Sequence, residues 1–282
     1  MATYVTSDIH GCMRSLDALL DHVSLGEKDE LWVLGDLADR GDSSADVIRW
    51  AVDAGSNVHF LMGNHDLMLQ AAVDETSGDF WPGIVGDWAY NGGLGTWDQL
   101  LQETTDEWRQ EKLLPFLLGM GSTARVEAGG RAWQLVHAGF DPDRYGVVQD
   151  PVETGFVQVE DFGAQRKDDL LWIRNEWLFS PKPAPVATVH GHTPTYSWRR
   201  PAKVFGEAGL EVTGRRGEPL VVLNRVNVDC GCCWGGRLCL LRLDDQTYSL
   251  ADARGRLRAT DVPLSPLADD ETTAGDESPA DA

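Results

Sequence analysis

Basic residues are scarce in this sequence. Its 282 residues contain 24 Lys and Arg against 45 Asp and Glu, so the formal net charge is −21 at pH 7. A surface that binds nucleic acid polymers needs clustered Lys and Arg, and this balance argues against one. It leaves room for a small phosphate site or for bound divalent cations.

Long apolar runs are also missing. No run approaches the roughly 18 residues of a membrane span, and the N-terminus lacks the charged-then-apolar pattern of a signal peptide. The five cysteines are an odd number for a disulfide framework and fit reduced thiols. We therefore expect a cytoplasmic protein with no membrane partner.

The apolar content is high enough for a substantial core. Hydrophobic residues make up 42% of the chain and charged residues 24%, which excludes wholesale disorder. The N-terminal half repeats a short apolar run, a loop rich in Gly, Asp or His, and a helical pattern. The three runs are Thr3–Thr6, Leu31–Leu34 and Val58–Met62. This repetition predicts βαβ units, right-handed crossovers and a largely parallel sheet.

The rest of the chain changes character several times. Residues 74–118 combine helical and irregular patterns with Trp81, Trp88, Trp97 and Trp108, which fit the core of a helical insertion or a lid over substrate. Later patterns predict a hairpin turning at Gly129-Gly130, a helix over 167–178, a strand over 185–189 and further strands after Val221. Residues 266–282 are acidic and without basic residues, typical of a disordered tail, which leaves 1–265 as one domain.

Acids and histidines follow the predicted strands. The residues in these positions are Asp8, His10, Asp36, Asn64, His65, His137, His190 and His192. Loops at the carboxyl ends of strands gather on one rim of an α/β sheet, so these side chains can converge. Carboxylate, imidazole and amide ligands together suit Mn²⁺, Fe²⁺, Zn²⁺ or Co²⁺ better than Mg²⁺ or Ca²⁺.

Each of these motifs alone is weak. An Asp-x-His after a strand is more often a turn than a ligand pair, and an Asn-His pair is most often a cap or turn. Five such motifs, each at a strand end, favour a shared metal centre over a set of unrelated turns.

Five motifs, in order, resemble those of the calcineurin-like metallophosphoesterases, and more narrowly the bacterial and phage branch of the phosphoprotein-phosphatase family. The motifs are Ser7-Asp8-Ile9-His10-Gly11, Gly35-Asp36-Leu37-Ala38-Asp39-Arg40-Gly41, Gly63-Asn64-His65-Asp66, His137-Ala138-Gly139 and Gly191-His192-Thr193. The likeness covers roughly residues 1–245. It implies an α/β fold, a four-layer α/β/β/α sandwich of two mixed sheets, with a dinuclear metal site on the rim.

The resemblance also implies six metal ligands. The first ion takes Asp8 and His10, the bridge between the ions is Asp36, and the second ion takes Asn64, His137 and His192. We expect two divalent ions, Mn²⁺ first, with Fe²⁺, Zn²⁺, Co²⁺ or Ni²⁺ as alternatives. Two cations roughly 3.5–4 Å apart lower the pKa of a bridging water and neutralise the phosphoryl oxygens.

Further roles follow from the same motifs. Arg40 matches the arginine that binds phosphate, and Asn64 also contacts substrate. Arg174 would be a second clamp, against the alternative of a surface salt bridge on a helix. His65 would donate a proton to the leaving oxygen, oriented by Asp39, whose carboxylate is expected to raise the pKa of the imidazole. His190 has no transferable role, and we expect a structural hydrogen bond.

The motifs conflict on the substrate. Asp39-Arg40-Gly41, His192-Thr193-Pro194 and residues 169–176 look like the bacterial protein phosphatases. By contrast, residues 1–4, residues 63–67 and the run 230–236 look like the symmetrical diadenosine-tetraphosphate hydrolases. Those hydrolases tend to lack the carboxylate at Asp39. The Cys-x-Cys-Cys run lacks the paired spacing of a zinc site and fits small buried residues in a turn.

The sequence thus predicts a metal-dependent phosphoesterase. The first interpretation is a serine/threonine phosphoprotein phosphatase in which a hydroxide between the two ions attacks a phosphomonoester. The alternative is a symmetrical dinucleoside tetraphosphate hydrolase, and the third is a non-catalytic binding scaffold, which the complete ligand set opposes. The partner is accordingly a phosphorylated protein or a small phosphoester, and the oligomeric state is open.

Overall fold

The computed structural model describes residues 1–74, 83–148 and 155–268. A six-stranded mixed sheet contains strands from the N-terminal and C-terminal parts of the chain. Its strands are β1 (Thr3–Thr6), β2 (Glu30–Val33), β3 (Val58–Phe60), β11 (Arg237–Arg242), β12 (Thr247–Asp252) and β13 (Leu257–Pro263). The order is β13-β12-β11-β1-β2-β3. β1, β2 and β3 are parallel, as the repeated units predict, whereas the other pairings are antiparallel.

A five-stranded mixed sheet comes from the middle of the chain. Its strands are β4 (Thr123–Ala128), β5 (Arg131–Val136), β8 (Thr188–His190), β9 (Leu220–Val222) and β10 (Arg225–Asn227), in the order β4-β5-β8-β10-β9. β5, β8 and β10 are parallel. β4 and β5 form the predicted hairpin, with Gly129 and Gly130 at φ of 61° and 78° in its turn. A separate hairpin pairs β6 (Phe156–Val159) with β7 (Gly163–Arg166).

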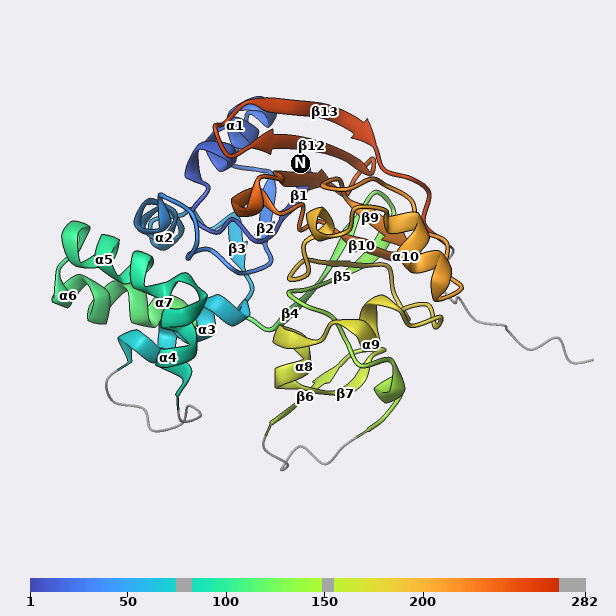
Figure 1. Cartoon of the computed structure of the whole chain (residues 1–282), viewed down its shortest axis with the longest axis horizontal. Coiled ribbons are helices and arrows are strands. Elements are labelled where there is room, and N and C mark those ends of the chain that lie inside the picture. The colour runs from blue at the N-terminus through green and yellow to red at the C-terminus, as the bar shows by residue number, and fades with distance from the viewer. Residues whose placement is uncertain (75–82, 149–154, 269–282) are drawn as a thin grey trace, which may run out of the picture.

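Helices flank both sheets and form the insertion (Figure 1). The α-helices are α1 (Met13–Val23), α2 (Ser44–Val52), α3 (Asn64–Val73), α4 (Ile84–Trp88), α5 (Leu94–Glu103), α6 (Asp106–Trp108), α7 (Leu114–Leu118), α8 (Lys167–Trp172), α9 (Asn175–Leu178) and α10 (Pro201–Glu207). Two π-helical turns, η1 (Ala89–Gly93) and η2 (Arg109–Leu113), join helices of the insertion. Short 3-10 turns are η3 (Pro142–Arg144), η4 (Thr195–Ser197) and η5 (Cys232–Trp234).

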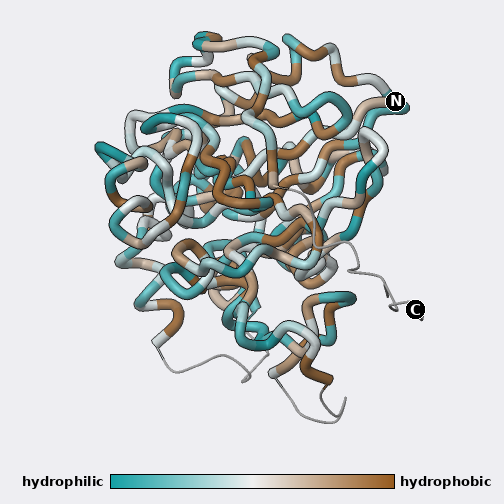
Figure 2. Tube along the Cα trace, turned by 90° about the vertical axis from the view of Figure 1, so that its right-hand side faces the viewer, coloured by the Kyte–Doolittle hydropathy of each residue, from teal (hydrophilic) through white to brown (hydrophobic). Residues whose placement is uncertain are grey.

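Side chains that alternate along the strands bury both faces of the first sheet. On β11, Cys239 and Leu241 point into the core between the sheets, while Leu238 and Leu240 pack with α1 and α2. A further core joins the outer face of the second sheet to α8, α9 and α10. Hydrophobic segments accordingly run through the middle of the trace (Figure 2). The result is the four-layer α/β/β/α sandwich that the resemblance implies.

The insertion packs into a hydrophobic core that it shares with α2 and α3. Trp88 is 3% exposed and packs with residues of α3, α5 and α7, and the ring of Trp97 meets it edge-on at 6.2 Å. Trp108 lies partly buried against the same cluster. These tryptophans therefore form a helical core rather than an open lid, while Trp81 lies outside the described residues. Most of the predicted acidic tail, from residue 269 on, also lies outside them.

One local prediction was wrong. The helix expected over 167–178 is broken, because Ile173 is extended (φ −59°, ψ 140°) and Arg174 is non-helical between α8 and α9. The break turns the Arg174 side chain toward the loop after β8.

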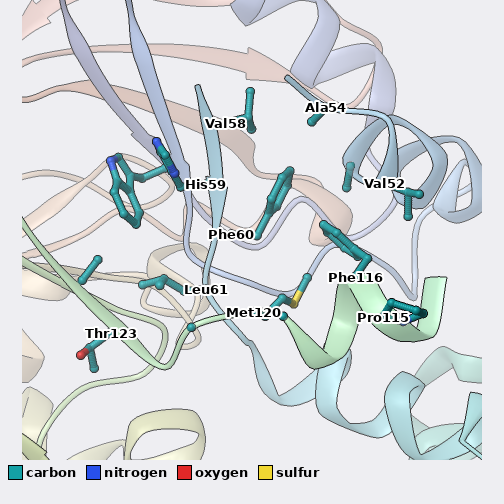
Figure 3. A pocket seen from close by; sticks show the side chains of 15 residues that line it. Val52, Ala54, Val58, His59, Phe60, Leu61, Pro115, Phe116, Met120 and Thr123 are labelled. Atoms are coloured by element: carbon teal, nitrogen blue, oxygen red, sulfur yellow. The ribbon is translucent and has the colours of Figure 1, made fainter. Parts of the chain in front are cut away.

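An apolar groove of about 560 Å³ opens beside β3, the edge strand of the first sheet. Figure 3 shows Phe60 of β3 and Phe116 of α7 beside this groove, with ring centroids 5.1 Å apart. His59 is the one titratable side chain among the described residues that line it. The groove therefore lacks the groups needed for phosphoester chemistry. Among the helices that the structure describes, none has the length and apolarity to cross a membrane.

Candidate active site

The carboxyl ends of five parallel strands, three from the first sheet and two from the second, carry the candidate residues. Asp8 and His10 follow β1, Asp36 follows β2, and Asn64 and His65 follow β3 at the start of α3. From the second sheet, His137 follows β5 and His192 follows β8, whose last residue is His190. All of these side chains are buried, with exposures of 5% or less. The two sheets thus bring the sequence-predicted residues to one rim.

The backbone of these loops is strained. Six of the eleven non-glycine residues with positive φ among the described residues are Asp8, His10, Asp36, Asp39, Arg40 and His192. Left-handed backbone costs about 1 kcal/mol or more for such residues. The strain is concentrated in the loops that aim the polar side chains at each other, which is where function is expected to maintain it.

Asp36 lies between two imidazoles. Its Oδ2 is 3.4 Å from Nε2 of His10, and its Oδ1 is 3.5 Å from Nε2 of His137. Each oxygen of one carboxylate therefore faces a different imidazole. This is the arrangement expected of a ligand shared by two cations.

Hydrogen bonds hold the imidazoles in orientations that suit metal ligands. Nδ1 of His10 lies 2.7 Å from the carbonyl of Ala38, and Nδ1 of His137 lies 2.6 Å from the carbonyl of Leu34. A proton on each Nδ1 satisfies these carbonyls and leaves Nε2 as the free lone pair. Nε2 of His192 is buried and has no hydrogen-bond partner within the described part of the chain. A cation would satisfy that nitrogen.

The remaining two predicted ligands lie at either side. Oδ1 of Asn64 is 3.1 Å from Nε2 of His137. Oδ2 of Asp8 accepts the backbone N–H of His192 at 3.0 Å and a short hydrogen bond from the Ser7 hydroxyl. The hydrogen bond from His192 thereby links the loop after β1 to the loop after β8.

Two groups of side chains in the described chain offer metal-ligand atoms within 4.8 Å of one another. One is His10, Asp36 and His65, and the other is Asp36, His137 and His192. Asp36 belongs to both, consistent with its bridging position. His65 belongs to the first group, although the resemblance makes it a proton donor.

Burial sets the charge state of the cluster. It raises the pKa of Asp36 well above its usual range, with Asp8 and Asp66 acting in the same direction. It lowers the pKa values of His10 and His192 well below the usual range. The imidazoles of His10 and His192 are therefore neutral, as ligands must be, and the carboxylates crowd together beside Arg40. Divalent cations would supply further compensating charge.

Asp229, two residues after β10, is a site residue that the sequence interpretation missed. It is 2% exposed, its Oδ1 accepts the N–H of Gly231 at 3.0 Å, and its Oδ2 is buried without a partner in the described residues. Burial raises its pKa well above the usual range, and the nearby charges of Asp8 and Asp36 add to the rise. The signal was available, because Asp229 also follows a predicted strand.

His65 and Asp39 form a buried pair that the insertion supports. Nδ1 of His65 is 2.5 Å from Oδ2 of Asp39. The same carboxylate accepts the indole N–H of Trp88 at 2.9 Å and the hydroxyl of Thr96 at 2.6 Å. Two residues of the insertion therefore fix Asp39, and Asp39 in turn fixes the imidazole.

The pKa of His65 differs from the expectation. Burial lowers it to about 2, and the positive charge of Arg40 acts in the same direction, so the Asp39 carboxylate does not raise it above its usual value. Burial also raises the pKa of Asp39, to about 6. Desolvation of both partners thus outweighs their mutual attraction, and the imidazole is neutral at pH 7.

The two arginines reach the cluster from opposite loops. Nη2 of Arg40 lies 2.7 Å from Nε2 of His65, and Nη1 makes a short contact with Nε2 of His10. Arg174 donates from Nη1 to the hydroxyl of Thr193 at 3.0 Å and to the carbonyl of His192 at 3.3 Å. Among the described residues it makes no salt bridge, which was the alternative considered for it.

His190 is buried and contacts the backbone of Gly191 and the ring of Trp177. Nδ1 of His190 is 3.2 Å from the carbonyl of Gly191, and its ring packs edge-on against Trp177 at 5.6 Å. Burial lowers its pKa to about 3. These contacts agree with a structural role.

Comparison with known proteins places this rim in a family. The sequence model of the family described as calcineurin-like phosphoesterase matches residues 1–235. The chain belongs to the calcineurin-like phosphoesterases. Such enzymes hydrolyse phosphoester bonds and use two divalent metal ions. The anchored imidazoles, the shared Asp36 and the unpartnered nitrogen of His192 fit that cofactor.

Individual calcineurin-like phosphoesterases resemble the chain over nearly its whole length. It is 29% identical to the symmetrical bis(5'-nucleosyl)-tetraphosphatase of Serratia proteamaculans, over 91% of this chain and 96% of that protein. The enzyme of the same name from Pectobacterium carotovorum is 29% identical over 88% and 94%. A crystal structure of a putative diadenosine tetraphosphatase superposes with a TM-score of 0.51 at 20% identity, over 89% of this chain and 92% of that one, which supports the fold.

Proposed function

We propose that this chain hydrolyses dinucleoside polyphosphates, with symmetrical cleavage of diadenosine tetraphosphate as its reaction. The observation that carries the proposal is the end-to-end similarity to the Serratia tetraphosphatase, which extends over 96% of that protein. The proposal reverses our first interpretation from sequence, which ranked phosphoprotein phosphatase above it. Local motifs suggested that ranking, and similarity along the whole chain outweighs them.

Six residues at the rim would bind the metal ions. Asp8, His10, Asp36, Asn64, His137 and His192 would hold the two ions. Bound there, two divalent ions would polarise the phosphoryl group and lower the pKa of a water molecule. Mn²⁺ is the ion we propose, because the mixed donor set suits it.

The cationic and acidic side chains would act on the substrate itself. The guanidinium groups of Arg40 and Arg174 would bind phosphoryl oxygens and hold the group in line for attack. His65 would protonate the leaving oxygen. Because a bound phosphoester brings negative charge next to the imidazole, it would raise the low pKa of His65 toward the range needed for proton transfer.

Hydrolysis of phosphoserine or phosphothreonine is the second candidate. It is favoured by Asp39, the carboxylate that the resemblance associates with protein phosphatases and that here holds His65 at 2.5 Å. The resemblance also associates Thr193 with protein phosphatases, and this residue accepts a hydrogen bond from Arg174.

Kinetics with both substrates separate the candidates. We expect the Mn²⁺-loaded protein to show a kcat/KM for diadenosine tetraphosphate at least about tenfold above that for a phosphothreonine peptide, a margin of about 1.4 kcal/mol. ADP should be the only nucleotide product, since symmetrical cleavage yields two equal halves. A preference for the peptide would reverse the assignment.

Removal of the metal tests the proposed mechanism. Chelator-treated protein should be inactive toward p-nitrophenyl phosphate and regain activity with Mn²⁺. Activity that persists without metal would overturn the mechanism.

A further inference from the structure

Five arginines line one open pocket of about 610 Å³. They are Arg216, Arg237, Arg254, Arg256 and Arg258, and we call this site the arginine pocket. Asp252 is the one carboxylate among the described residues that line it. The chain has 24 basic residues against 45 acidic ones, so this grouping runs against its overall charge.

Much of the positive charge in the pocket is not neutralised. Asp252 accepts hydrogen bonds from Nε of Arg256 at 3.0 Å and from Nε of Arg258 at 2.8 Å. Arg237 donates to the carbonyl of Gly217, and no hydrogen bond involves the side chain of Arg254 within the described residues. One carboxylate thus faces five guanidinium groups. Such a concentration of like charge attracts an anion.

The local structure orients the guanidinium groups for binding. Arg256 lies just before β13 and Arg258 lies within it, and both side chains reach the same oxygen, Oδ2 of Asp252. Across the pocket, the guanidinium of Arg216 stacks on the ring of Tyr196 at 3.7 Å, while its Nε donates to the Tyr196 carbonyl at 2.6 Å. Arginine held in this way presents its remaining N–H groups as paired donors, which match phosphate oxygens.

The arginine pocket borders the active site along two segments. Gly235 and Gly236 line it and directly follow Trp234, whose exposed ring lies 5.2 Å from the guanidinium carbon of Arg40. Tyr196 also lines it and is four residues beyond His192. Two short segments of chain therefore connect residues of the pocket to residues at the rim.

We propose that the arginine pocket binds a polyphosphate anion. Its five guanidinium groups exceed what a single phosphate can engage, so a chain of phosphates is the ligand that would use them. Two sources share this chemistry. The anion is the distal phosphate portion of the substrate held at the rim, which rests on the proposed function, or it is a separate polyphosphate that regulates the enzyme.

Calorimetry with inorganic tripolyphosphate tests the site directly. The full chain would be measured in the presence of a chelator, so that metal ions at the rim do not bind tripolyphosphate. The same measurement would be made on the double variant R216A/R254A. Both side chains are exposed, and neither makes a salt bridge within the described chain, so the fold should survive. Binding should weaken by about tenfold or more, because two charge-assisted contacts are lost. Affinity should also fall as salt is added.

A matched control removes the same charge elsewhere. The variant K28A/K112A replaces two exposed lysines that lie outside the arginine pocket. It should bind tripolyphosphate within about twofold of the unaltered protein, as expected for charges that do not contact the ligand. Equal loss in both double variants would show a nonspecific charge effect and overturn the proposal, as would no loss in R216A/R254A.

Steady-state kinetics distinguish the two sources of the anion. If the pocket holds the distal part of the substrate, R216A/R254A should raise KM for diadenosine tetraphosphate by about tenfold and leave kcat/KM for p-nitrophenyl phosphate unchanged. If the anion is a separate molecule, R216A/R254A should lose tripolyphosphate binding. Its KM for diadenosine tetraphosphate and its kcat/KM for p-nitrophenyl phosphate should then both stay unchanged. Failure of the proposed function would look different, since tripolyphosphate would still bind but diadenosine tetraphosphate would not be cleaved.

Discussion

At the scale of single residues, the rim is a set of buried imidazoles around crowded carboxylates. Asp36 faces His10 with one oxygen and His137 with the other, at 3.4 and 3.5 Å. Each imidazole is held through Nδ1 by a backbone carbonyl, which leaves Nε2 directed at the carboxylate. The side chains are thereby positioned before any ligand arrives, which is how a binding site avoids paying for reorganisation.

His65→Ala separates proton donation from metal binding. If His65 is the proton donor, kcat should fall by about 10²–10⁴-fold, because the leaving oxygen loses its general acid. The number of Mn²⁺ ions per chain, measured by mass spectrometry of the digested protein, should stay the same. His22→Ala, at a histidine of α1 paired with Asp261, is the control and should change neither. Loss of metal together with turnover would make His65 a ligand.

Asp229→Asn tests the residue that sequence interpretation missed. The amide keeps the size of the side chain and its acceptor for the Gly231 N–H, but it removes one buried negative charge beside Asp8 and Asp36. Affinity for Mn²⁺ should drop by about tenfold, since the cations lose part of their attraction. Titration calorimetry measures this. Asp261→Asn, at an exposed carboxylate, should leave the affinity unchanged, and an equal affinity in Asp229→Asn would show that its charge plays no part.

At the scale of elements, the strand-end loops were predictable and their cross-links were not. Apolar runs followed by Gly, Asp and His located β1, β2 and β3 to within two residues and placed their acids on one rim. The break at Ile173 and Arg174 could not be read locally, because those residues suit a helix and contacts with the loop after β8 decide the geometry.

The link between the insertion and the site was equally hidden. Trp88 and Asp39 are 49 positions apart, and nothing in the pattern of either segment pairs an indole N–H with a buried carboxylate. The pKa of His65 was misjudged for a related reason. A sequence shows that Asp39 is available as a partner, but it does not show how completely both groups are removed from water.

Gly191→Ala tests the close approach of the β8 loop to the β1 loop. A Cβ at Gly191 would lie 2.1 Å from both Oδ2 of Asp8 and Oγ of Ser7, so the loops must move apart. The free energy of unfolding in urea should fall by about 1–3 kcal/mol, and Mn²⁺ affinity should fall with it.

The control for this change is a glycine with open space. Gly206→Ala lies in α10, where an added Cβ meets nothing within 4 Å. It should stabilise the protein by about 0.5–1 kcal/mol, because alanine favours a helix over glycine. If both substitutions had the same effect, the tight contact at Gly191 would not constrain the site.

At the scale of the whole molecule, the distribution of charge matters more than its total. A chain with a net charge of −21 concentrates arginines at the rim and in the arginine pocket, while the buried carboxylates Asp8, Asp36 and Asp229 lie in the strand-end loops of the rim. The two sheets each contribute loops that carry the proposed metal ligands, so the proposed site forms only when the sandwich is assembled. Folding and cation binding are accordingly coupled in this architecture.

Metal stoichiometry tests the central claim most directly. The full chain would be saturated with Mn²⁺, passed through a desalting column and analysed for manganese and protein. The rim should retain two Mn²⁺ per chain, and Asp36→Ala should retain at most one, because the shared carboxylate is lost. A count of one or none in the unaltered protein would contradict a dinuclear site built from these six ligands.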